Sequence, residues 1–73
     1  MSKLPRISGR QAIAALGRVG FLAIRQAGSH VILKRSEPFA QLVIPNHKEL
    51  DTGTLRAIIR QADLSVDEFL GLI

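Results

Sequence analysis

The chain has 73 residues, of which 47% are hydrophobic and 22% are charged, and this is enough for one packed core but not for two. The composition excludes a multidomain enzyme, and it lacks the low hydrophobicity and high charge of a disordered chain. There is no cysteine, so disulfide scaffolds, thiol nucleophiles and zinc sites with thiolate ligands are also excluded. We expect a single domain over residues 1–73.

The formal net charge is +4, and it is divided unevenly along the chain. Residues 1–36 contain seven Lys or Arg and no acid, whereas residues 37–73 contain three Lys or Arg and six acids. Clustered cations attract phosphates, so we expect a polyanion such as a nucleic acid to contact the first half. No stretch approaches the roughly 18 apolar residues that cross a membrane, and residues 1–8 lack the apolar run of a secretion signal. These features predict a cytoplasmic protein without a membrane partner.

The first half of the chain predicts one helix and two strands. Ser8 and Gln11 have the spacing of a helix capping box, and apolar residues recur at helical intervals until Gly20, which favours a helix over about residues 9–18. Residues 21–26 and 30–35 are rich in strand formers, and the sequence between them is typical of a tight turn. The two runs therefore predict an antiparallel hairpin.

The second half predicts a third strand followed by two helices. The strand should run from Phe39 to Ile44 and end at Pro45. A second capping-box pattern, Ser65 to Glu68, predicts a short helix at the end of the chain. An amphipathic helix is expected before it, where apolar residues follow the spacing i, i+3, i+4, i+7, namely Leu55, Ile58, Ile59 and Ala62.

The order of these elements predicts an α+β fold, α-β-β-β-α-α, in which a three-stranded antiparallel sheet has helices packed on one face. The other face of the sheet is then open to solvent. Phe21, Phe39 and Phe69 all fall at apolar positions, so we expect them in the core and expect no platform for stacking nucleic-acid bases.

His30 is the candidate catalytic residue. Side chains alternate along a strand, so His30 and Lys34 share the solvent face if Val31 and Leu33 point into the core. An imidazole exchanges protons near neutral pH, and a nearby cation can hold a phosphate. A histidine at a turn is more often an ordinary surface residue, and the residues alone favour that interpretation.

Other polar residues give weaker indications. His47, in the loop after the third strand, is a possible second acid or base, although a histidine that only orders this loop fits better. His47, Glu49 and Asp51 alternate as metal ligands can, but a polar loop produces such spacing by chance, so we expect no metal and no cofactor. Arg56 and Arg60 lie one helical turn apart. They either form a second phosphate contact or belong to a helix face that is exposed to solvent, and the second interpretation is favoured.

Three motifs occur in a specific order: a Gly-Ser-His element, a Pro-x-His corner and a Gly-Thr-Leu-Arg helix. With these motifs the sequence resembles the HicA (YcfA-like) family of small bacterial toxins over nearly its whole length. The matching segments are Ser8-Gly9, Gly20-Phe21, Arg25 to His30, Val43 to His47 and Gly53 to Ala62.

The resemblance implies a fold like that of double-stranded-RNA-binding domains and a metal-independent ribonuclease that cuts messenger RNA. It also implies a HicB-like antitoxin that covers the active site. The catalytic histidine of the family is the one in the Gly-Ser-His element, which is His30 here.

RNA supplies its own nucleophile, the 2′-hydroxyl, so the enzyme needs only to move protons and to steady the charge on phosphorus. His30 would be the general base, or base and acid in turn. Gly28 and Ser29 would let the backbone approach RNA closely, or would only form the turn. The expected phosphate contacts are Lys34, Arg25 and Arg35.

Two other functions stay open at this point. The first is a non-catalytic RNA-binding module on the same fold. The second is a protein-interaction subunit that docks a partner on its open sheet face and whose basic residues serve only solubility.

Overall fold

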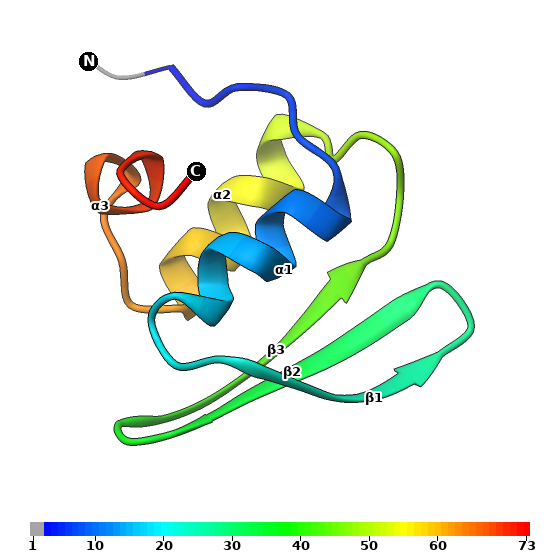
Figure 1. The fold of residues 1–73 in the computed structure, drawn as a ribbon. Coiled ribbons are helices and arrows are strands. Elements are labelled where there is room, and N and C mark those ends of the chain that lie inside the picture. The colour runs from blue at the N-terminus through cyan, green and yellow to red at the C-terminus, as the bar shows by residue number, and fades with distance from the viewer. Residues whose placement is uncertain (1–2) are drawn as a thin grey trace.

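A computed structural model describes residues 3–73 and has the expected order of elements (Figure 1). The strands form one antiparallel sheet in the order β1-β2-β3, and α1 and α2 lie across one face of it. The predicted α+β fold class is confirmed. The elements are α1 (Gly9–Gly17), β1 (Leu22–Ala27), β2 (His30–Ser36), β3 (Phe39–Pro45), α2 (Thr52–Gln61) and α3 (Val66–Leu70).

The helices begin at capping residues. Both predicted capping boxes are present: the Ser8 hydroxyl accepts the N–H of Gln11 at 3.0 Å, and Ser65 caps α3 in the same way. The cap of α2 was not predicted from the sequence. Asp51 fills that role, because its carboxylate accepts the N–H of Thr54 at 2.7 Å and the Thr54 hydroxyl at 3.0 Å.

The core lies between the helices and the two strands β2 and β3. Val31 and Leu33 point from β2 into this core, as expected, and Leu42 and Ile44 do so from β3. All six residues of β1 are exposed, because α1 and α2 pack mainly against β3, at the opposite edge of the sheet (Figure 1). The open face of the sheet, opposite the helices, is called the outer face below.

Phe21 and Phe69 are buried, but the prediction that Phe39 lies in the core is wrong. The Phe39 side chain is 66% exposed. Because Leu42 and Ile44 point inward, the alternation of side chains along β3 turns Phe39 to the outer face.

A corner beside the start of β2 joins three segments that are distant in the sequence. The N–H of Gly9 donates to the carbonyl of His47 at 2.9 Å, and the N–H of Asn46 donates to the carbonyl of Ser29 at 2.6 Å. A Cβ atom on Gly9 would collide with the carbonyl oxygen of Pro45. Glycine at this position therefore allows the N-terminus of α1 to lie directly against the end of β3.

Replacing Gly9 with alanine should destabilise the fold by about 1–3 kcal/mol, because the added methyl group forces the backbone of Pro45 away. Gly17→Ala is the matched control, since a Cβ there meets nothing within 4 Å. This control should raise stability by about 0.4–1 kcal/mol. Urea unfolding of both variants measures the difference, and equal stabilities would contradict the close approach.

The pKa of Asp51 lies below its ordinary value of 3.8 because the carboxylate accepts the backbone N–H of Thr54 and then its hydroxyl. A depressed pKa means that this cap stabilises the fold above the unfolded pKa and that the effect disappears as pH falls through the folded pKa. In Asp51→Asn, which keeps an oxygen acceptor, the loss of stability on acidification below about pH 4 should be smaller. Urea unfolding at a series of pH values measures this, and an acid dependence identical to wild type would contradict the assignment.

Candidate functional site

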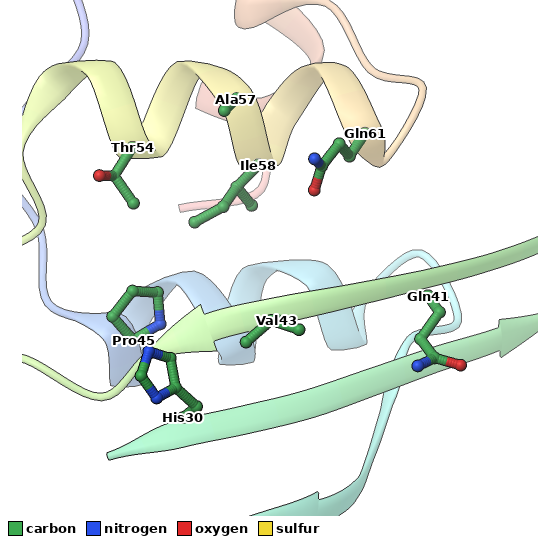
Figure 2. Close-up of a pocket in the computed structure, with 8 residues that line it drawn as sticks. All are labelled: His30, Gln41, Val43, Pro45, Thr54, Ala57, Ile58 and Gln61. Carbon is green, nitrogen blue, oxygen red and sulfur yellow. The ribbon is translucent and has the colours of Figure 1, made fainter.

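A groove of about 580 Å³ runs between α2 and the β3 edge of the sheet (Figure 2). Among residues 3–73, no lysine, arginine, aspartate or glutamate lines it, and His30 is the one titratable lining residue. The lining residues are His30, Gln41, Val43, Pro45, Thr54, Ala57, Ile58 and Gln61.

The lining residues on each wall of the groove are spaced by the period of the strand or helix that carries them. Every second residue of β3 contributes to one wall, and residues of α2 spaced by three or four contribute to the other. Over four strand residues or seven helix residues these walls run for roughly 10–13 Å. The β3 residues are Pro45, Val43 and Gln41, and the α2 residues in the same order are Thr54, Ile58 and Gln61.

Polar groups therefore stand at both ends of an apolar middle. Figure 2 shows His30 beside Pro45 at one end, with Thr54 above them, and Gln41 and Gln61 towards the other end. His30 and the two glutamines lie too far apart to touch one small group at once, so the groove has two distinct polar ends.

His30 is the first residue of β2, where its Cα lies opposite Ala27 of β1 and Pro45 of β3. The side chain is exposed, as expected, and makes no hydrogen bond or ion pair with any of residues 3–73. Pairing on both sides fixes the backbone, while the ring itself is available to a ligand. This combination suits a residue that must meet a substrate in a defined orientation.

The Gly28-Ser29 turn holds His30 at the end of the hairpin. Gly28 has φ +60°, a conformation that favours glycine. Ser29, the second residue of the turn, does not have a positive φ, and this combination is that of a type II′ turn. Ser29 uses its carbonyl to bind the N–H of Asn46. A Cβ on Gly28 would meet nothing within 4 Å, so the backbone of the turn is open to an approaching ligand.

Arg25 and Lys34 lie on the outer face with His30, but at different distances from it. Arg25 pairs with Ile32 and is diagonal to His30, so their Cα atoms are roughly 7–8 Å apart. Lys34 lies four residues along the strand, roughly 13 Å away. Its Nζ atom is 5.5 Å from the centre of the Phe39 ring. The cation nearest to His30 on this face is therefore Arg25, and Lys34 is too far away to contact the same phosphate as His30.

Arg35 shares the face of Leu33 and not that of His30. Its guanidinium lies 4.5 Å from the centre of the Phe21 ring, and its Nε–H donates to the carbonyl of Pro38 at 2.9 Å. The structure therefore does not bring Arg35 together with the other residues of the predicted site, and its contacts are those of a structural residue.

His47 lies in the exposed loop after β3 and does not line the groove. Of the other two loop residues in the metal hypothesis, Glu49 forms an ion pair with Arg6 at 2.8 Å and Asp51 caps α2. Within residues 3–73, no three His, Asp or Glu side chains gather as they would around a metal ion.

Sequence reasoning missed the wall that α2 contributes. The signal was present as a second stripe on this helix at spacing i, i+4, i+7, which shares Ile58 with the buried stripe, but only the tertiary structure shows that it faces β3. The residues of this stripe are Thr54, Ile58 and Gln61.

A comparison with protein families matches residues 9–64 to the family described as "HicA toxin of bacterial toxin-antitoxin". The chain belongs to the HicA toxin family. The matched segment contains all three strands, α1, α2 and every residue of the groove. A HicA toxin is the toxin of a bacterial toxin–antitoxin system, with an antitoxin as its partner. The search of curated proteins found no match, and in residues 3–73 no helix has the length and apolar character needed to cross a membrane.

Arg35→Gln should lower the free energy of unfolding by about 1–2 kcal/mol, because it removes the contact with Phe21 and a charged hydrogen bond to Pro38. Arg25→Gln is the matched control on the outer face and should leave stability unchanged. Thermal unfolding of the two variants measures this difference. A stable Arg35→Gln variant would show that these contacts do not support the fold.

Proposed function

We propose that this HicA toxin is a metal-independent endoribonuclease that cuts messenger RNA by acid–base chemistry at His30. The observation that carries the proposal is the His30 ring itself, which is exposed, has no partner within residues 3–73 and stands at the end of a groove. Arg25 lies diagonal to His30 on the same face, and an imidazole with a cation nearby suits the cleavage of a phosphodiester by the adjacent 2′-hydroxyl.

The reaction needs no protein nucleophile. His30 takes the proton of the 2′-hydroxyl, and the 2′-oxygen attacks the adjacent phosphorus. The bond from phosphorus to the 5′-oxygen breaks, and that oxygen takes up a proton from the imidazolium or from water. The products are a 2′,3′-cyclic phosphate and a 5′-hydroxyl, so atoms and charges balance without a redox step or a cofactor.

The cations and the turn would position the RNA backbone. Arg25, diagonal to His30, is our candidate for contacting the phosphate that is cut, and Lys34 would contact a phosphate further along the strand. Gly28 and Ser29 would allow the sugar-phosphate chain to come close to the histidine. Arg35 is left out of the proposed site because it lies on the face of β2 opposite to His30, and His47 because it lies in the loop after β3, outside the groove.

We also propose that the antitoxin is HicB-like and inhibits by covering His30 and the groove, in the cytoplasm. Exposed apolar side chains on the sheet support a protein partner there, since a bound protein would remove them from water. They include Leu22, Ile24 and Val43.

A non-catalytic RNA-binding module is the second candidate function. It is favoured by one observation, that the part of the chain described by the structure puts no second titratable residue in the groove lining to serve as the general acid. Binding of RNA by the wild-type chain without any turnover would decide for this alternative.

His30→Ala should lower the rate of RNA cleavage by about 10²–10⁴-fold in the presence of EDTA, because it removes the group that moves the proton. His47→Ala is the matched histidine control and should keep the wild-type rate. Cleavage of a labelled RNA, with analysis of the product ends, measures both variants, and circular dichroism checks that both are folded. A wild-type rate in His30→Ala, or products without a cyclic phosphate, would end the proposal.

A further inference from the structure

A second group of side chains, around the end of the groove far from His30, has the chemistry of a ligand site. Lys34 of β2 lies opposite Gln41 of β3. Phe39 precedes Gln41 by two residues, so its side chain is on the same face of β3. Gln61 stands across the groove, on α2. These four residues, Lys34, Phe39, Gln41 and Gln61, are called the distal cluster.

Phe39 is the unexpected member of the distal cluster. It is 66% exposed and plays no part in the core, so its ring is available to another molecule. The Lys34 ammonium lies 5.5 Å from the centre of this ring. A cation over an exposed ring is held weakly, so a flat ligand can displace it.

The amides of the distal cluster are also unused. Neither Gln41 nor Gln61 makes a side-chain hydrogen bond within residues 3–73. An amide offers a donor and an acceptor side by side, which matches the edges of nucleic-acid bases. An aromatic ring, a cation and amides together fit a nucleotide: the ring stacks on the base, the cation contacts a phosphate, and the amides bind the base edge.

Charge favours a nucleic acid over a protein segment as the occupant. The groove carries no acidic lining residue, and Lys34 is the charged member of the distal cluster. Glu37, in the turn between β2 and β3, is the nearest acid in the sequence. A lysine beside a groove without acidic lining residues can contact a phosphate, while the uncharged groove suits the uncharged bases.

We propose that the distal cluster is a second nucleotide subsite, which stacks an unpaired base of single-stranded RNA on Phe39 and contacts its phosphate through Lys34. This inference rests on the proposed function, since it supplies a further part of the same RNA site. Lys34 and Gln41 lie roughly 13 Å from His30 along the strands, and Phe39, two residues further from it along β3, lies roughly 20 Å away. The stacked base is therefore not at the bond that is cut but further along the strand.

The subsite restricts the substrate to RNA that is single-stranded on this side of the cut. A base can stack on a side chain only when it has left its own helix, whereas the phosphates of a duplex would meet Arg25 and Lys34 equally well. Phe39 thus provides a selectivity that cations alone cannot.

The test measures binding separately from cleavage. The probe is a fluorescent 2′-O-methyl oligonucleotide, which lacks the nucleophilic hydroxyl and cannot be cut, and fluorescence anisotropy gives its affinity. Phe39→Leu should weaken binding by about tenfold, because leucine cannot stack on a base. Ile24→Ala is the matched control, since Ile24 is another exposed apolar residue of the sheet.

A scan with abasic positions then identifies the stacked base. Removing one particular base of the oligonucleotide should weaken binding to the wild-type chain and have no effect on Phe39→Leu. Lys34→Gln serves as a second variant, and it should reduce the slope of log affinity against log salt by about one unit.

The outcomes separate this inference from the nuclease proposal. The subsite would be overturned, even if His30-dependent cleavage occurs, by equal affinities of wild type and Phe39→Leu for the oligonucleotide. The same conclusion would follow if each abasic position changed the affinity of both proteins equally. A loss of affinity for the antitoxin alone would also overturn it. Binding that depends on Phe39 without any cleavage would support the subsite and overturn the nuclease.

Discussion

The candidate site depends on the close contact between Gly9 and the end of β3. This contact brings the first turn of α1 onto the backbone of Pro45 and His47, and only a residue without a Cβ atom fits there. Pro45 in turn lies opposite His30 in the sheet. The backbone of His30 is therefore held by its pairing with a strand end against which α1 packs, and the ring itself makes no hydrogen bond within the described residues.

The molecule separates its charges from its groove. Arg25 and Lys34 stand on the outer face, while the groove beside them is lined by amide, hydroxyl and apolar groups and by His30. A charged polymer with uncharged, flat side groups matches this division, because its backbone and its bases meet different surfaces. The same division leaves the His30 imidazole without an ion pair within the described residues, so its ring is open to a ligand.

Local patterns in the sequence predicted most of the fold and part of the site. The two capping boxes located α1 and α3, and alternation along β2 correctly put Val31 and Leu33 in the core and His30 on the open face. Phe39 was wrongly placed in the core, because an aromatic residue in a strand does not tell which face the helices cover. The groove escaped prediction because it requires the relative position of α2 and β3, and the same is true of the contact between Arg35 and Phe21.

The irregularity in β1 has a consequence for how this protein behaves at high concentration. β1 is an edge strand with all its residues exposed, and its pairing with β2 shifts between Ala23 and Arg25, which leaves Ile24 as an extra residue. Such a bulge bends the strand and disturbs the even row of N–H and C=O groups that another chain would need for edge-to-edge pairing. A toxin released from its antitoxin would thus present an apolar sheet to water while its open edge discourages growth into fibrils.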